Sequence, residues 1–109
     1  MSANVIVTTT STIEGKPAQE HCGIVAGEII IGANSFRDWM ASIRDAVGGR
    51  SDSYEELFGE ARDNAVAELQ SKAAARGGNA VVGVSLDYEV IGEKGSMLMV
   101  CATGTAVRV

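Results

Sequence analysis

Three side chains in this sequence are of types that bind soft metal ions: His21, Cys22 and Cys101. Thiolate and imidazole groups are good ligands for zinc and for heavier metals. His21 and Cys22 lie in an expected strand, where consecutive side chains point to opposite faces, so they can share one ion only across a bulge. Cys101 can join Cys22 if their strands are neighbours. These three residues therefore form a candidate heavy-metal site.

The same residues have simpler interpretations. The two cysteines are far apart in sequence and fit a reducing compartment, where buried thiols act as small apolar side chains beside a strand-edge histidine. A Cys22–Cys101 disulfide is a third alternative. Met97, Met99 and Cys101 also share one face of an expected strand, at a spacing that suits copper(I), although methionine more often fills a core. The sequence leaves these alternatives open.

Three arginines precede the second of two expected helices. Arg37-Asp38 recurs seven residues later as Arg44-Asp45, which stacks the arginines on one side of a helix, and Arg50 follows in the loop. Guanidinium groups beside the free amides of a helix start can bind an anion. The alternative is that these arginines form ion pairs with a neighbouring subunit.

The segment from Gly48 to Leu57 joins the two helical patterns. Its glycines end the first helix. Asp52 or Ser53 caps the start of the second helix, and the glutamate three residues after the cap can reach back to the free backbone amides there. Capping does not explain Arg50 or Tyr54, so the segment is expected to do more than turn the chain. Together with the arginines, it defines a candidate ligand site at these residues: Arg37, Arg44, Arg50, Tyr54 and Glu55.

The sequence indicates that the protein is not an enzyme. Asp87 and Glu89 share a strand face, as acid–base carboxylates do, but a solvated face explains them better and no other catalytic group accompanies them. The chain has one histidine and lacks a Ser-His-Asp set, a CxxC motif, a phosphate loop and a dinucleotide fingerprint.

Length, charge and hydropathy exclude several classes. The 109 residues form one domain, 1–109. The net charge is −5 and the basic residues are scattered, which argues against a nucleic-acid partner. The amino terminus lacks a signal peptide, and Glu28 interrupts the longest apolar run, so no membrane span is expected. A cytoplasmic location follows as the default expectation.

Hydrophobic periodicity predicts two helices and four strands. The helices cover 34–47 and 53–76, and the strands cover 5–9, 19–32, 80–91 and 96–107. The second helix carries one i, i+4 apolar row before Gly77-Gly78 ends it: Leu57, Ala61, Ala65, Leu69 and Ala73. Residues 80–91 alternate, with one face made of Ala80, Val82, Val84, Leu86, Tyr88 and Val90. Glycines inside 19–32 suggest bulges or close backbone approach.

Two expected strands are apolar on both faces. In 96–107 the residues Met97, Met99 and Cys101 point one way, and Leu98, Val100 and Ala102 point the other, while 19–32 is similar. Two helices can cover only one face of a four-stranded sheet. We therefore expect an obligate homo-oligomer whose subunits meet through sheet surfaces. Burial of either strand at the centre of a two-layered sheet is the alternative.

A family resemblance rests on motifs spread over nearly the whole chain: Cys22-Gly23-Ile24-Val25, Gly32-Ala33-Asn34, Phe36-Arg37-Asp38, Ile43-Arg44-Asp45, Gly48-Gly49-Arg50-Ser51, Tyr54-Glu55, Val81-Val82-Gly83, Asp87-Tyr88-Glu89, Gly95-Ser96-Met97-Leu98-Met99-Val100 and Gly104-Thr105-Ala106-Val107. On these, the chain from Thr9 to Val107 resembles the YbjQ-like family of small bacterial proteins. The resemblance implies an α+β subunit, with a small mixed or antiparallel sheet and two helices on one face, assembled into a homopentameric ring.

The family's name attributes heavy-metal binding to it, and the resemblance implies no established reaction. Cys22 matches the family pattern, whereas His21 and Cys101 depart from it. Two hypotheses follow. In the first, the protein is a metal- or small-ligand-binding module with sites between subunits. In the second, its pentameric ring engages a protein partner without a small ligand.

Overall fold

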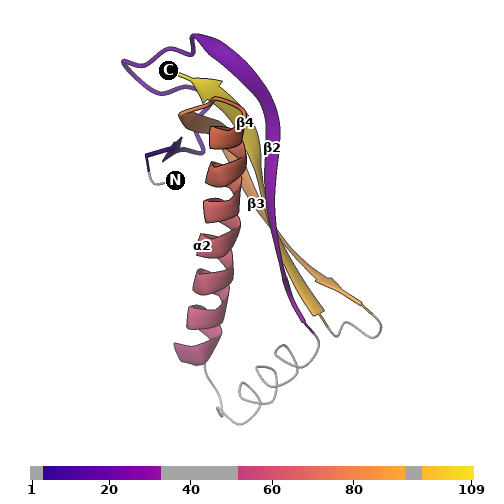
Figure 1. The fold of residues 1–109 in the computed structure, drawn as a ribbon. Coiled ribbons are helices and arrows are strands. Elements are labelled where there is room, and N and C mark those ends of the chain that lie inside the picture. The colour runs from indigo at the N-terminus through magenta and orange to yellow at the C-terminus, as the bar shows by residue number, and fades with distance from the viewer. Residues whose placement is uncertain (1–3, 33–51, 93–96) are drawn as a thin grey trace.

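The computed structural model describes residues 4–32, 52–92 and 97–109, which form a mixed α+β fold (Figure 1). The elements in chain order are β1 (Ile6–Val7), β2 (Glu20–Ile31), α2 (Asp52–Ala75), β3 (Ala80–Ile91) and β4 (Met97–Arg108). The strands form a four-stranded sheet in the order β1-β3-β4-β2. β1 is parallel to β3, and the other pairs are antiparallel, so the sheet is mixed.

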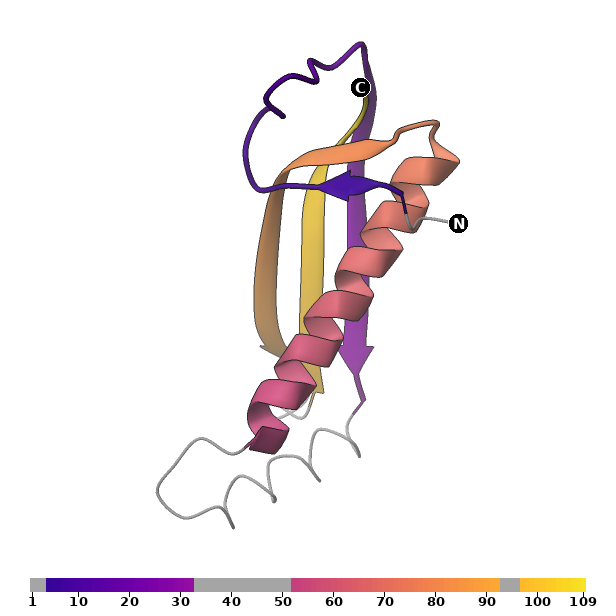
Figure 2. The same ribbon diagram turned by 90° about the vertical axis from the view of Figure 1, so that its left-hand side faces the viewer.

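The three long strands lie where the apolar patterns predicted them, and each has 12 residues. The predicted even alternation of β3 is wrong at one place. Gly83 has a φ of +62°, and the pairing with β4 shifts between Val82 and Ser85. This bulge brings Val81 and Val84 into the core and leaves Val82 half-buried. Figure 2 shows that β3 bends sharply near its start.

α2 packs across one face of the sheet through small side chains. Its buried residues follow the predicted four-residue row: Ala61, Ala65, Leu69 and Ala73. The helix lies close to β2, because a Cβ on Gly27 would lie 2.7 Å from the Leu69 backbone nitrogen and closer still to the Ala65 carbonyl oxygen. α2 ends before Gly77, whose φ of +85° suits a helix terminus.

The core lies between α2 and the face of the sheet that the helix covers. On the central strand β4, Leu98, Val100 and Ala102 are buried on this face. The first predicted helix, 34–47, lies outside the described residues. The sequence predicted two helices on one face of the sheet. Among the described residues, one helix, α2, lies on that face.

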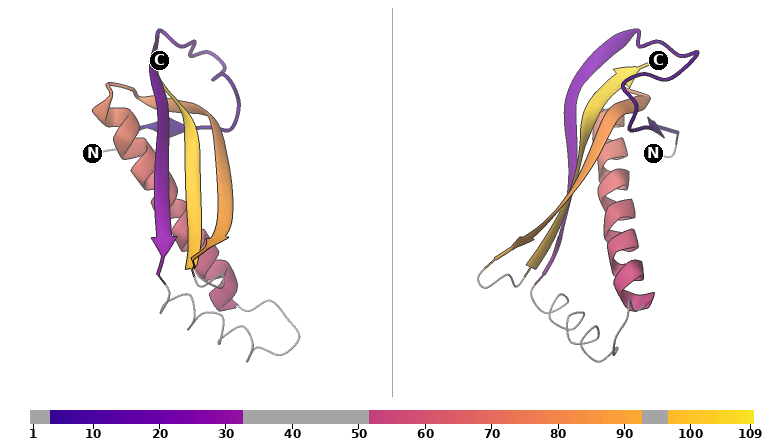
Figure 3. Two further views of the ribbon diagram at one scale, coloured as in Figure 1. Left: turned by 90° about the vertical axis from the view of Figure 1, so that its right-hand side faces the viewer. Right: turned by 180° about the vertical axis from the view of Figure 1, so that it is seen from behind.

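The face of the sheet opposite α2, which we call the outer face, is partly apolar. Met97, Met99 and Cys101 alternate with the core residues of β4 and are half-buried. On β2, Ile24 is 76% exposed and Ile30 is 57% exposed. Both faces of β2 and β4 thus carry apolar side chains, as the sequence predicted. Figure 3 shows this face and the divergence of the sheet from α2 toward the far ends of β3 and β4.

Candidate functional site

Cys22 lies at the start of β2, beside a bulge. The pairing of β2 with β4 shifts between His21 and Gly23, so the bulge that joint metal binding by His21 and Cys22 requires is present. However, Cys22 is half-buried and packs against the core, whereas His21 is exposed. The Arg76 guanidinium donates a hydrogen bond of 3.3 Å to the Cys22 carbonyl oxygen. The bulge does not bring the imidazole and the thiol to the same surroundings.

Cys101 lies on the central strand, far from Cys22. The two strands are neighbours, but their register pairs Cys101 with Glu28 and places Cys22 beside Gly23, which pairs with Ala106. Glu28 lies six positions after Cys22 on β2, which corresponds to about 20 Å of strand. Both cysteines are free thiols. The sheet therefore does not unite Cys22 with Cys101 in one metal site or in a disulfide within a chain.

The metal ligands do not gather elsewhere in the part of the chain that the structure describes. None of its His, Cys, Asp and Glu side chains form a group of three or more that could hold a metal ion. A structural zinc site needs four such ligands and a catalytic one needs three. A centre of this kind does not fit the described residues of a single chain.

Cys101 occupies an acidic environment on the outer face. It pairs with Glu28 on one side and with Asp87 on the other. Burial raises the pKa of the Cys101 thiol, the carboxylates of Glu28 and then Asp87 raise it further, and Lys72 acts in the opposite direction. The neutral thiol is favoured near neutral pH, so Cys101 is a weak nucleophile there. A hollow beside it is lined by Asp87, Tyr88, Glu89, Met99 and Cys101.

The predicted ligand site falls largely outside the described residues. Arg37, Arg44 and Arg50 lie in the segment that the structure does not describe. The backbone of Tyr54 and Glu55 lies in the first turn of α2, at the helix end with free amides. The grouping of these five residues stays a prediction.

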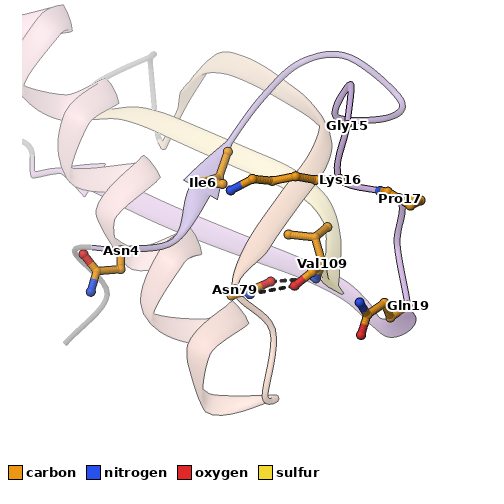
Figure 4. A pocket seen from close by; sticks show the side chains of 8 residues that line it. All are labelled: Asn4, Ile6, Gly15, Lys16, Pro17, Gln19, Asn79 and Val109. Atoms are coloured by element: carbon orange, nitrogen blue, oxygen red, sulfur yellow. Dashed lines mark hydrogen bonds between the residues drawn. The ribbon is translucent and has the colours of Figure 1, made fainter.

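A pocket that the sequence did not predict lies where the two ends of the described chain meet (Figure 4). Asn79 holds the backbone of Val109, because its side-chain oxygen accepts a bond of 2.8 Å from the Val109 amide and its side-chain nitrogen donates one of 3.1 Å to the Val109 carbonyl oxygen. The pocket is lined by Asn4, Ile6, Gly15, Lys16, Pro17, Gln19, Asn79 and Val109. Its amide groups and the Lys16 amine suit a small polar group.

The sequence gives little warning of this pocket, because its residues come from three distant segments. The turn signals at Gly15 and Pro17 and at Gly77-Gly78 mark loops, and only the strand order places those loops together.

Within the described ranges, no helix has the length and apolar character needed to cross a bilayer.

Comparison with known proteins defines the family. The fold is similar to the crystal structure of a protein of unknown function from Pediococcus pentosaceus ATCC 25745, which belongs to the DUF74 family. That likeness has a TM-score of 0.59 and 17% sequence identity, and it covers 96% of this chain and 97% of the other. At this identity it shows the fold alone. The YbjQ_1 family model, described as "Putative heavy-metal-binding", matches residues 5–109, so the chain belongs to this family.

Proposed function

We propose that this protein is a non-enzymatic, homopentameric binding module that carries metal or small-ligand sites between its subunits. The family description supports binding of a heavy metal. The proposed assembly rests on apolar side chains that are exposed among the described residues. Ile24 and Ile30 are exposed on the outer face, and Tyr88 and Val90 are 44% and 58% exposed on the face toward α2.

Covering such side chains favours association. Complete burial of one large apolar side chain contributes about 1.5–3 kcal/mol, so four partly covered ones supply a substantial driving force. Isolated exposed apolar residues are ordinary, but apolar side chains on both faces of neighbouring strands are typical of an interface. This pattern supports an obligate assembly over a monomer.

The free strand edges favour a ring over a symmetric pair. In the described part of the chain, β2 pairs only with β4, and β3 beyond Ser85 pairs only with β4. These two long edges lie on opposite sides of the sheet and differ from each other. Long free edges are normally covered in native proteins. If β2 of one subunit meets β3 of the next, the contact is heterologous, and repeating it closes a ring when the rotation between neighbouring subunits completes a full turn.

We further propose that ligand sites lie at the boundaries between subunits. The described His, Cys, Asp and Glu residues of one chain lack a three-ligand metal group, and a second subunit can supply the ligands that these residues lack. For an anionic ligand, we propose the five sequence-predicted residues, since three arginines and the amides at the start of α2 supply positive charge: Arg37, Arg44, Arg50, Tyr54 and Glu55.

Native mass spectrometry of untagged protein, purified without chelator, tests this function. We expect a pentamer mass with a reproducible excess of metal or small molecule per subunit. A monomer at micromolar concentration would contradict the argument from the uncovered apolar surface. A bare pentamer that stays bare after zinc, copper and nickel are offered would contradict the metal-binding function.

The alternative function is a ring that engages a protein partner without a small ligand. The exposed Tyr88 and Val90 favour it, because aromatic and branched side chains on an open strand suit a protein interface. The variant Arg44→Ala distinguishes two roles of Arg44: binding a ligand and forming an ion pair between subunits. If Arg44 binds a ligand, the ring stays whole and the bound mass disappears. If it forms an ion pair across the interface, the ring dissociates.

A further inference from the structure

Four apolar side chains gather on the outer face of the sheet, at the end where β3 finishes and β4 begins. Met99 pairs with Ile30 on β2, and Met97 pairs with Ile91 on β3. Residues that pair directly across neighbouring strands share one face, so these side chains are neighbours. Ile30 is 57% exposed, and the other three are half-buried. We call these four residues the apolar patch. The left view of Figure 3 turns this face toward the reader, with α2 behind the sheet.

Three carboxylates border the apolar patch. Glu28 and Asp87 lie on either side of Cys101, and Glu89 lies beside Met99. All three acidic residues are exposed, and none forms a salt bridge with another residue that the structure describes. The described residues that pair with this part of β4 include no lysine or arginine. We call the three carboxylates the acidic border.

The charge of the border decides which kind of partner fits the patch. A second copy that presented the same surface would bring carboxylates against carboxylates, and like charges that face each other across an interface oppose binding. Pairing of strand edges extends the sheet sideways and does not by itself cover its faces. A partner that carries lysine or arginine beside its own apolar side chains complements both the patch and its border.

The position of the patch on the face of the sheet favours a helical partner. The backbone groups of the central strand β4 are engaged with β2 and β3, so they are not open to a further strand. A helix satisfies its own backbone hydrogen bonds and can cover a sheet face through side chains alone, as α2 does on the other face. Met97 and Met99 suit such a contact, because flexible methionine side chains adapt to the shape of an apolar partner.

We propose that the apolar patch and the acidic border bind a basic amphipathic helix of another protein. The apolar side chains of that helix pack on the patch, and its lysine or arginine side chains pair with Glu28, Asp87 and Glu89. This inference rests on the alternative function, binding of a protein partner, and names the chemistry of that partner. The surface lies within one subunit, so the contact itself does not require the ring.

A titration of the full-length protein into a fluorescently labelled peptide tests this surface. The probe is a peptide of about 14 leucine and lysine residues, with the leucines along one helical face at i, i+3, i+4 and i+7 spacing. Fluorescence anisotropy at physiological ionic strength should show one peptide bound per subunit. A peptide with glutamate in place of every lysine, and a scrambled leucine–lysine peptide without an apolar face, should each bind about tenfold more weakly or less.

Ile30→Ser tests the apolar patch. It replaces an apolar contact by a hydroxyl group and should weaken peptide binding about tenfold. Ile24→Ser is the matched control, because it makes the same change at another exposed isoleucine of the outer face, about 20 Å away along β2. It should keep wild-type affinity. Both side chains are largely exposed, so both variants should fold, which circular dichroism checks.

The double variant Glu28→Gln and Glu89→Gln tests the acidic border. Loss of two exposed charge pairs should weaken peptide binding about fivefold and reduce its dependence on salt. The control double variant, Glu14→Gln and Glu60→Gln, makes the same change in net charge at exposed residues of the loop before β2 and of α2. It should leave the affinity unchanged.

Four results would overturn the inference. Wild-type protein could fail to bind the leucine–lysine peptide, or bind the leucine–glutamate peptide as tightly. Ile24→Ser could weaken binding as much as Ile30→Ser. The two double variants could lose equal affinity, in which case the net charge of the protein drives binding and the acidic border has no special role.

Native mass spectrometry of the same samples separates this inference from the proposed function. A pentamer that carries a metal or a small molecule but does not bind the peptide leaves the binding module standing and removes the docking surface. A monomer that binds the peptide, and loses it in Ile30→Ser, supports the docking surface and contradicts the ring.

Discussion

The two ends of the sheet differ in how well their outer strands are covered. At the end near Ala80 and Val107, which we call the closed end, both residues are fully buried. At the opposite end, the open end, Val90 on β3 and Ile30 on β2 are 58% and 57% exposed. The central strand β4 is covered near both ends, since Leu98 near the open end is 3% exposed and Val107 at the closed end is fully buried.

The difference follows from the side chains that each end presents to α2. At the closed end, small residues such as Ala73 and Ala106 let the helix lie close to the sheet, and β1 covers the start of β3. At the open end, Phe58 meets Tyr88 edge-to-face with ring centroids 5.4 Å apart, which holds the helix farther away. We infer that the closed end supplies most of the subunit's stability and that the open end is available for contacts with other chains.

Leu69→Ala should have the largest effect on the subunit. Leu69 is fully buried between α2 and the sheet, and removal of such a side chain costs about 2–5 kcal/mol of unfolding free energy. Chemical denaturation measures the loss. Val90→Ala at the open end is the control and should cost well under half as much. Equal losses would contradict the difference between the two ends.

Gly27→Ala should have the next largest effect. The added methyl group would overlap the Ala65 carbonyl oxygen and lie 2.7 Å from the Leu69 backbone nitrogen, so the helix must move away from β2. Overpacking of this kind costs about 1–3 kcal/mol. Gly32→Ala is the matched control, because a Cβ there meets nothing within 4 Å. A Gly27→Ala protein as stable as wild type would show that the helix is not held closely at this point.

Periodicity predicted most of the described elements, because amphipathic patterns depend on neighbours in the sequence. The four-residue row of α2 and the apolar runs of the long strands each need only local information. The bulge at Gly83 was missed because alternation continues on both sides of it in the sequence. Only its φ of +62° and the shifted pairing with β4 show that the two halves of β3 are out of phase.

The candidate site was predicted less well, because it depends on register. The sequence suggested that Cys22 and Cys101 meet if their strands are neighbours, and β2 and β4 are neighbours. The register nevertheless pairs Cys101 with Glu28, near the other end of β2. No local pattern fixes an antiparallel register between segments about 80 residues apart in the chain. The shared face of Met97, Met99 and Cys101, in contrast, was visible in the sequence because these residues lie within one strand.

Val90→Ser should weaken assembly with little effect on subunit folding. Val90 is largely exposed, so the hydroxyl replaces an apolar surface that a neighbouring chain is expected to cover. A loss of about 1.4 kcal/mol per contact corresponds to tenfold weaker association, which sedimentation at decreasing concentration can measure. Ile6→Ser, a similar change on β1 at the closed end, is the control and should leave assembly unchanged. Equal dissociation of both variants would contradict the assignment of the open end to assembly.

Cys101 should alkylate slowly, and this is the smallest expected effect because it changes a rate without unfolding the chain. In a Cys22→Ser background only Cys101 reacts with iodoacetamide. Burial, Glu28 and Asp87 raise the pKa of its thiol while Lys72 opposes them, so at a given pH the folded protein holds less thiolate than the urea-unfolded chain. The rate should therefore rise with pH through a higher range in the folded protein.

The carboxylates make this last prediction specific, because slow alkylation alone would follow from burial of the thiol. Glu28→Gln removes one of the negative charges that raise the pKa, so the pH profile should move toward lower pH. Glu14→Gln, in the exposed loop before β2, makes the same change away from Cys101 and should leave the profile unmoved. If both variants keep the wild-type profile, burial and Asp87 raise the pKa of the thiol without a contribution from Glu28. The pairing of Cys101 with Glu28 across β4 and β2 would then carry no measurable electrostatic coupling.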